Sequence, residues 1–174
     1  MNNLMIDLEA LGTGHNGLIT QIGGCYFDWS GEIGDTFLYN INLKSAVAVG
    51  MTLDIGAVLF WISQVAINGS PSWITDSVPL QQVLNDLVKI FKQTDSIWSH
   101  TFDRVLLRDA GNLCGMPNLI PHKKWREINT LVALAGTTKI KTKHLKTHNA
   151  LDDCLYQIEY CVACYRSLHD NNKK

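Results

Sequence analysis

The stretch LMIDLE (residues 4–9) near the N-terminus places two carboxylates at the end of a short apolar run. Such a run predicts a buried strand. Asp7 and Glu9 are separated by one residue, so on a strand their side chains leave the same face of the sheet. Paired carboxylates in apolar surroundings repel each other unless a cation neutralises them, and Mg²⁺ and Mn²⁺ prefer such oxygen ligands. In the simpler alternative the strand ends at Glu9 and the Glu9 side chain is hydrated.

A third carboxylate follows a short strand that we expect at residues 96–99. Asp103 comes directly after Phe102 at the start of a helix predicted over residues 101–113. The helix dipole alone favours a carboxylate at this place, without any ligand. Ligand sites in open α/β sheets nevertheless lie at the ends of strands. Asp103 is therefore a candidate for the same site as Asp7 and Glu9.

The stretch HNALDD (residues 148–153) adds an imidazole and two carboxylates before a long apolar-periodic run. A helix predicted over residues 149–168 places His148 just outside its start and Asp153 in its first turn. The structural alternative is Asn149 as a cap, followed by two acids that the helix dipole favours. Geometry does not choose between Asp152 and Asp153. We expect the three segments to meet around divalent metal ions.

Apolar patterning along the rest of the chain predicts an α/β fold with a central sheet. Strands are expected at residues 4–8, 18–27, 35–43 and 96–99, and helices at residues 52–66, from Pro79 onward, at 101–113 and at 149–168. Residues 127–135 fit a short strand or a short helix equally well. The predicted inward faces are Leu53, Ala57, Phe60 and Trp61; Phe102, Val105, Leu106 and Ala110; and Leu151, Leu155, Ile158, Val162 and Tyr165.

Length and composition are those of a globular protein: 174 residues, of which 46% are hydrophobic and 18% charged. We expect residues 1–169 to form a single domain and residues 170–174 a polar C-terminal tail. The net charge of −1 neither supports nor excludes a nucleic-acid partner. A carboxylate cluster lowers the net charge, and metal ions bound to it supply a positive field.

Cysteine usage and hydrophobic runs bear on the compartment. The chain has five scattered cysteines, which indicates reduced thiols in a cytoplasmic protein. We find no signal-peptide pattern at the N-terminus, and no apolar run reaches the length of about 18 residues that a membrane span requires.

The three segments resemble the motifs of the DEDDh exonucleases, the DnaQ-like branch of the ribonuclease H-like fold. Residues 6–9 look like the first motif, Asp-x-Glu on the first strand, and residues 102–103 look like the second. The spacing of His148, Ala150 and Asp153 matches the third motif, which selects Asp153 over Asp152. The resemblance is nearest to short phage-type exonucleases and ribonuclease T-like enzymes, and it covers nearly the whole chain. Residues 19–23 and 125–131 are similar to further segments of these proteins.

The resemblance implies a mixed five-stranded sheet flanked by helices, and a 3'-5' exonuclease that releases 5'-mononucleotides by a two-metal-ion mechanism. Two Mg²⁺ or Mn²⁺ ions would be held by the carboxylates, and neutral His148 would act as the general base. One residue departs from the family pattern: Ala10 stands where Thr usually follows the Glu of the first motif, near the terminal nucleotide. The implied catalytic residues are Asp7, Glu9, Asp103, Asp153 and His148, and the four acids among them are the implied metal ligands.

A basic stretch indicates where a single strand would run. Residues 122–147 contain seven Lys and Arg residues against one acid, Glu127, and lead into His148. This stretch fits a rim that tracks phosphates, although a solvated loop has the same composition. The expected substrate contacts are Ala10, Leu11, Phe102, Lys143 and Lys146, with His15 as a further stacking candidate; for Phe102 a core position is the favoured alternative.

The expected partners are single-stranded 3' ends, with DNA favoured over RNA, and no membrane. Discrimination between the two rests on contacts to the 2'-hydroxyl, which the sequence does not place. A homodimer is possible, because several relatives form dimers. The resemblance to phage-type enzymes suggests the cytoplasm of a bacterial or phage-infected cell.

Two other interpretations compete with the enzyme. Cys161-x-x-Cys164 together with His144 and His148 has a zinc-like spacing, but the cysteines lie inside a predicted helix, where buried free cysteines are common. A non-catalytic nucleic-acid-binding module on the same fold is the second alternative. The presence of all four acids and of His148 argues against it.

Overall fold

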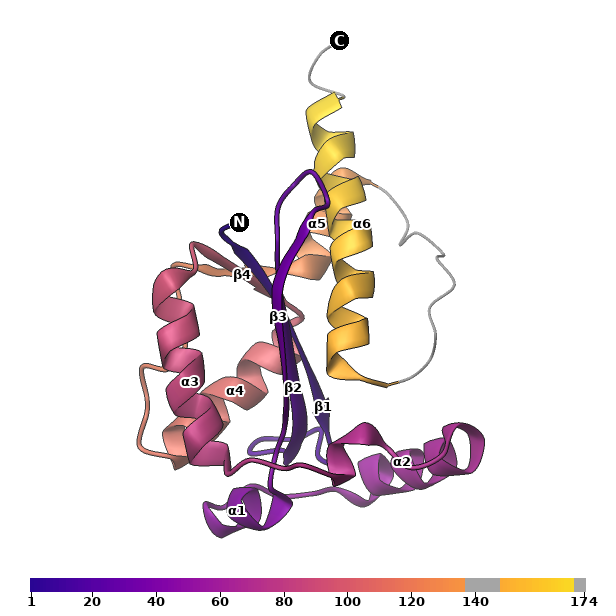
Figure 1. The fold of residues 1–174 in the computed structure, drawn as a ribbon, viewed down its shortest axis with the longest axis vertical. Coiled ribbons are helices and arrows are strands. Elements are labelled where there is room, and N and C mark those ends of the chain that lie inside the picture. The colour runs from indigo at the N-terminus through magenta and orange to yellow at the C-terminus, as the bar shows by residue number, and fades with distance from the viewer. Residues whose placement is uncertain (137–147, 171–174) are drawn as a thin grey trace.

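The computed structural model describes residues 1–136 and 148–170, and Figure 1 shows their arrangement. The elements in chain order are β1 (Asn3–Ala10), β2 (Ile19–Phe27), β3 (Ile33–Asn40), α1 (Leu43–Ala48), α2 (Ile55–Asn68), the 3₁₀ helix η1 (Ser72–Ile74), α3 (Leu80–Gln93), β4 (Ser96–Ser99), α4 (Thr101–Leu113), β5 (Trp125–Glu127), α5 (Ile128–Ala135) and α6 (Ala150–Asp170).

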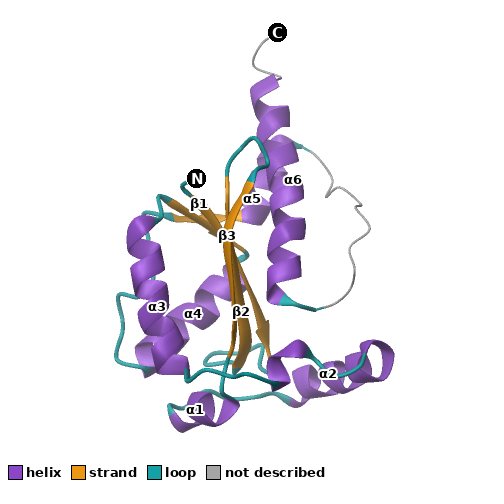
Figure 2. Ribbon diagram, in the orientation of Figure 1, coloured by secondary structure: helices purple, strands orange, loops and turns teal. Residues whose placement is uncertain are grey.

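The strands form one mixed five-stranded sheet in the order β3-β2-β1-β4-β5. β2 pairs antiparallel with β1 and β3, whereas β4 pairs parallel with β1 and β5. Helices cover both faces of this sheet: α3 and α4 lie on one side, and α5 and α6 lie on the other (Figure 2). The predicted fold class, a mixed five-stranded sheet flanked by helices, is confirmed.

Alternation along β1 divides its side chains between two cores. Leu4, Ile6 and Leu8 pack with apolar residues of α3 and α4. Met5 packs on the opposite face, with apolar residues of α5 and α6. Because Asp7 and Glu9 follow Met5 in steps of two residues, they leave the sheet on the face that α6 covers.

Several predicted boundaries agree with the structure, and others differ for local reasons. The strand at residues 96–99 and the helix at 101–113 have the predicted limits. The ambiguous segment 127–135 contains the last residue of β5 followed by α5. α2 begins at Ile55 rather than near Thr52, because the Asp54 side chain caps it by accepting the N–H of Ala57 at 2.8 Å. The short helices α1 and η1 are absent from the sequence prediction.

The predicted core face of α2 is largely wrong. Trp61 is buried, but Leu53 and Phe60 are exposed. The helix lies beyond one end of the sheet rather than flat against a face (Figure 1), so it has little surface to pack against. It carries no charged residue, and an exposed apolar surface of this kind often contacts a partner. The homodimer considered above remains a prediction.

α6 also buries a stripe other than the one expected. Its predicted stripe is correct for Ile158 and Val162, which are buried, but Leu151, Leu155 and Tyr165 are only half-buried. The residues of α6 that face the sheet recur at helical spacing and are mostly small: Ala150, Cys154, Gln157, Cys161 and Cys164.

No described helix is both long enough and apolar enough to cross a membrane.

Candidate active site

Three carboxylates from the two ends of the chain meet between β1 and α6. One oxygen each from Asp7, Glu9 and Asp153 lies within 4.8 Å of the other two. Asp7 and Glu9 are carried by β1, and Asp153 stands in the first turn of α6. The structure therefore brings the acids of the first and third motifs together.

This meeting requires α6 to approach β2 closely at Gly23, the residue that pairs with Asp7 across the sheet. A Cβ atom on Gly23 would lie 2.4 Å from the carbonyl carbon of Ala150 and 2.6 Å from the amide nitrogen of Leu151. Both contacts are with backbone atoms, which cannot rotate away. Only glycine at position 23 lets the first turn of α6 lie so near β2.

Asp103 lies beside the cluster, in the first turn of α4. It is 4% exposed, and its Oδ2 accepts the backbone N–H of His100 at 3.1 Å. The side chain of His100 in turn caps the helix, which completes a capping box. The charge of Asp103 acts on Asp7 and Glu9, so the second motif belongs to the same electrostatic site.

Gln157 is a site residue that the sequence analysis missed. Its Nε2 donates a 2.6 Å hydrogen bond to Oδ1 of Asp7, and the side chain is 5% exposed. Its Oε1 is buried and has no hydrogen-bond partner among the described residues. The available signal was a polar residue four positions after Asp153, one helical turn along the face that packs on the sheet.

Burial raises the pKa values of Asp7, Glu9 and Asp103. The pKa of Asp7 lies well above its usual value because of burial and the charges of Asp103, Asp153 and Glu9. Burial, followed by the nearby charge of Asp153, raises the pKa of Glu9 to about 8. Burial also raises the pKa of Asp103 to about 8, although the backbone amides of His100 and Leu8 oppose it.

These observations show that the donor set fits a divalent cation. The ligand atoms are carboxylate oxygens, which hard cations such as Mg²⁺ and Mn²⁺ prefer. Their negative charge is unfavourable in this buried place without a counter-charge. A structural ion-pair network would place Lys or Arg among them. Among the described residues, no positively charged side chain shifts the pKa of Asp7, Glu9 or Asp103.

His148 stands immediately before α6 and is half-buried. Its φ of +45° lies in the left-handed region that non-glycine residues seldom adopt, a feature that clusters at functional sites. Its ring centroid lies 5.0 Å from that of Phe60 and 5.8 Å from that of Trp61, both in α2. The aromatic residues of α2 thus fix the position of the imidazole in this structure.

A cavity of about 310 Å³ opens beside Glu9. Ala10 and Phe102, two of the predicted substrate contacts, line it together with Phe60 and Trp61. The expectation that Phe102 favours the core is wrong, because 40% of its surface is exposed. Leu11, a third predicted contact, lies in the hydrophobic core instead, and its backbone N–H donates to the carbonyl of Leu18.

The predicted basic rim is described only in part. Lys143 and Lys146 lie outside the described residues, as does His144 of the zinc alternative. Lys123 and Arg126 are exposed, whereas Lys124 donates to the backbone carbonyls of residues 91 and 92 at the end of α3. His15 is held by the Asp109 carboxylate at 3.3 Å and is not among the residues that line the cavity.

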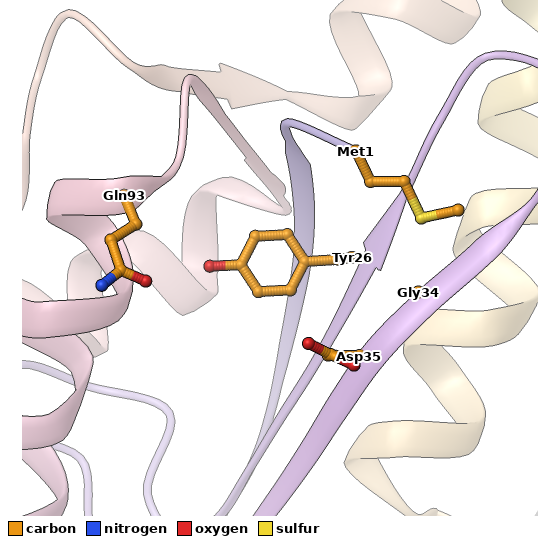
Figure 3. A pocket seen from close by; sticks show the side chains of 5 residues that line it. All are labelled: Met1, Tyr26, Gly34, Asp35 and Gln93. Carbon is orange, nitrogen blue, oxygen red and sulfur yellow. The ribbon is translucent and has the colours of Figure 1, made fainter.

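Another hollow in the described part of the chain has no part in the acid cluster. Figure 3 shows this hollow of about 440 Å³, lined by Tyr26 and Gln93 together with Met1, Gly34 and Asp35. It contains a single carboxylate and none of the motif residues. The cavity beside Glu9 is therefore the better candidate for a substrate site. The five cysteines, all among the described residues, form no disulfide, and Cys161 and Cys164 are buried within α6.

Comparison with solved structures identifies the fold. Escherichia coli exonuclease I in complex with a dA16 oligonucleotide aligns with a TM-score of 0.70 and 15% identity, over 97% of this chain and 42% of that one. A product-bound structure of exonuclease I aligns with a TM-score of 0.62 and 14% identity, over 97% of this chain and 43% of that one. The chain thus spans less than half the length of these proteins. A search of curated proteins finds no match.

The sheet order and the alignment with exonuclease I show that the chain has a ribonuclease H-like fold. The model of the 3'-5' exoribonuclease Rv2179c-like domain matches residues 2–165. The chain belongs to this Rv2179c-like family.

Proposed function

We propose that the protein is a metal-dependent 3'-5' exonuclease that hydrolyses the terminal phosphodiester of a single-stranded nucleic acid and releases 5'-mononucleotides. The observation that carries the proposal is the convergence of Asp7, Glu9 and Asp153 within 4.8 Å beside a cavity that Glu9 also lines. Membership of a family described as 3'-5' exoribonucleases supports the reaction class.

The four acids would hold two divalent ions, Mg²⁺ or Mn²⁺. Bound ions would supply the positive charge that favours an ionised water and a negatively charged leaving oxygen. Asp7, Glu9 and Asp153 offer the oxygens nearest to one another, and Asp103 completes the set beside Asp7. Gln157 keeps the Asp7 carboxylate oriented through its 2.6 Å hydrogen bond.

His148 would accept the proton of the attacking water. An imidazole suits this role because its pKa is ordinarily near neutrality. Its ring contacts Phe60 and Trp61, and both of these also line the cavity beside Glu9. The imidazole is therefore close to the space that the terminal nucleotide would occupy.

The cavity beside Glu9 would receive the last nucleoside of the strand. Phe60 and Phe102 are both partly exposed on its wall and offer ring faces on which a base stacks without regard to sequence. The Ala10 carbonyl accepts the indole N–H of Trp61 at 3.0 Å, which ties α2 to the end of β1 and closes one wall of the cavity. Ala10 itself adds no side-chain hydrogen bond.

The sugar of the substrate distinguishes an RNA strand from a DNA strand. The description of the family names RNA, and this favours ribonucleotide ends for the present chain. The preference for DNA expected from the sequence remains a prediction. Exonuclease I, whose structure holds a dA16 oligonucleotide, is too distant in sequence to decide it.

The deciding experiment compares matched single strands of DNA and RNA, each labelled at the 5' end, with Mn²⁺, with Mg²⁺ and with EDTA. We expect a ladder of products shortened from the 3' end, with 5'-mononucleotides released, which EDTA abolishes. RNA shortened faster than DNA would support the family assignment of substrate. Binding to either strand without any shortening would instead support the non-catalytic module.

A further inference from the structure

The buried amide of Gln21 links three parts of the chain that surround the acid cluster. Gln21 is fully buried and lies directly opposite Glu9 in the β1–β2 ladder. Its Oε1 accepts the backbone N–H of Ala150 at 2.9 Å. Its Nε2 donates to Oδ1 of Asn40 at 2.8 Å and to Oγ of Ser72 at 3.0 Å. One side chain therefore joins β2 to β3, to η1 and to the first residue of α6.

The first turn of a helix has N–H groups without partners inside the helix. In α6, Oδ1 of Asn149 accepts the N–H groups of Leu151 and Asp152. The N–H of Ala150 is bonded to Gln21 instead, which lies 129 residues away in the sequence. The hydrogen bond thus fixes the start of α6 to the sheet as well as satisfying a buried donor.

The same network holds the cap residue. Nδ2 of Asn149 donates to Oγ of Ser72 at 3.1 Å, and the same Oγ also accepts a hydrogen bond from Nε2 of Gln21. Asn40 donates to the carbonyls of Ser72 and Thr75, which holds η1 against β3. The start of α6 is consequently fixed at two adjacent residues, Asn149 and Ala150.

Asp153 follows Ala150 by three residues, which is less than one helical turn, so the two move together as one rigid segment. Cross-strand partners share a face of the sheet, so Gln21 and Gly23 lie on the same face as Glu9 and Asp7. Gly23 has no side chain to keep α6 at a distance, and the Gln21 side chain forms the hydrogen bond that holds α6 close to β2.

We propose that Gln21 is a positioning residue for the acid cluster: its amide holds the first turn of α6 at the depth where Asp153 meets Asp7 and Glu9. This inference rests on the proposed function in taking the cluster as a metal site. The side-chain hydrogen bonds of Gln21 go to Ala150, Asn40 and Ser72, and Gln21 does not line the cavity beside Glu9. It therefore acts on the cluster through the placement of α6.

The test is Gln21→Met, which keeps the length of the side chain but removes its hydrogen bonds. We expect Mn²⁺ affinity, measured by calorimetry, to fall about tenfold or more, as for other residues that orient metal ligands. The Mn²⁺ concentration for half-maximal activity should rise by the same factor, while KM for the strand at saturating Mn²⁺ stays unchanged. Excess Mn²⁺ should restore much of the rate, which a general loss of structure would not allow.

Thr20→Val is the matched control. Thr20 is adjacent to Gln21 and equally buried, but its hydroxyl has no hydrogen-bond partner among the described residues. We expect wild-type Mn²⁺ affinity for this variant. Should Gln21→Met prove unfolded by circular dichroism, Ser72→Ala removes a single exposed hydroxyl of the same network and should weaken Mn²⁺ binding several-fold.

Two results would overturn the proposal: unchanged Mn²⁺ affinity in the folded Gln21→Met or Ser72→Ala protein, or an equal loss of affinity in Thr20→Val. A wild-type protein that binds Mn²⁺ but shortens neither strand would contradict the proposed function instead. The comparison of Mn²⁺ affinities would still decide the role of Gln21 in that case.

Discussion

At the scale of single residues, the adjacent acids at the start of α6 provide the sharpest contrast. Asp153 lies in the carboxylate cluster, whereas Asp152 is exposed on the wall of a separate hollow. We predict that Asp153→Asn lowers the metal-dependent rate by more than about 100-fold, the upper end for residues that only orient a ligand. Asp152→Asn should retain most of the rate. Equal losses in both variants would contradict this assignment.

His148 is the second residue with a distinct predicted effect. His148→Ala should lower kcat by about 10²- to 10⁴-fold, the usual contribution of a general base, while calorimetry still detects Mn²⁺ binding. The expected metal affinity is unchanged because the imidazole is not among the three groups whose oxygens converge. Undiminished turnover would remove His148 from the base role.

The choice of Asp153 over Asp152 shows what residue patterns can and cannot predict. Helical geometry leaves the two acids equivalent, and only the spacing of the third motif separates them. The partner of Asp7, Gln157, escaped prediction because a glutamine on a helix looks like a surface residue until the opposite strand is in place. Phe102 is exposed in a cavity that Phe60 and Trp61 of α2 also line, and the sequence does not predict that α2 lies beyond the end of the sheet.

At the scale of elements, the cavity between β1, α2 and α4 makes its own prediction. Phe60→Ala and Phe102→Ala should each weaken binding of a single strand by about 1–3 kcal/mol, the range for one base stacked on an aromatic ring. The expected change for Phe102→Ala is a higher KM with a similar kcat, whereas Phe60→Ala should also lower kcat because Phe60 contacts the His148 imidazole. Ile62→Ala, on the same helix but exposed and absent from the lining residues, is the control. An unchanged KM in both phenylalanine variants would argue against this cavity as the nucleoside site.

α6 explains why the strands were easier to predict than the faces of the helices. The apolar runs of β1 and β2 mark buried strands without knowledge of their neighbours. Hydrophobicity favours Leu151 and Leu155 as the core stripe of α6, yet Ala150 and Cys154 face the sheet. Small residues are needed there because α6 must approach Gly23 closely, and that requirement comes from the site rather than from the helix.

At the scale of the whole molecule, the buried acids link stability to pH. In the folded protein without metal, the pKa values of Glu9 and Asp103 are about 8, above the values near 4 of an unfolded chain. The folded state therefore binds more protons between these values, and the free energy of unfolding falls as pH rises from about 4 to about 8. Bound divalent ions should remove this loss by favouring the charged carboxylates.

We therefore predict that Mn²⁺ raises the melting temperature more at about pH 8 than at about pH 5.5, where protons compete with the metal. Thermal unfolding with Mn²⁺ and with EDTA at both pH values measures the difference. The Asp152→Asn protein serves as a control, since that acid lies outside the cluster. A larger rise at the lower pH would contradict the expected direction.

The proposed function requires that Asp7, Glu9 and Asp153, from distant parts of the chain, share metal ions. Crystals grown with Mn²⁺ test it directly, because the anomalous scattering of manganese locates the ions without reference to the protein. We predict anomalous peaks within bonding distance, about 2.0–2.2 Å, of carboxylate oxygens of Asp7, Glu9 and Asp153. Manganese bound elsewhere, with none at these three carboxylates, would contradict the account.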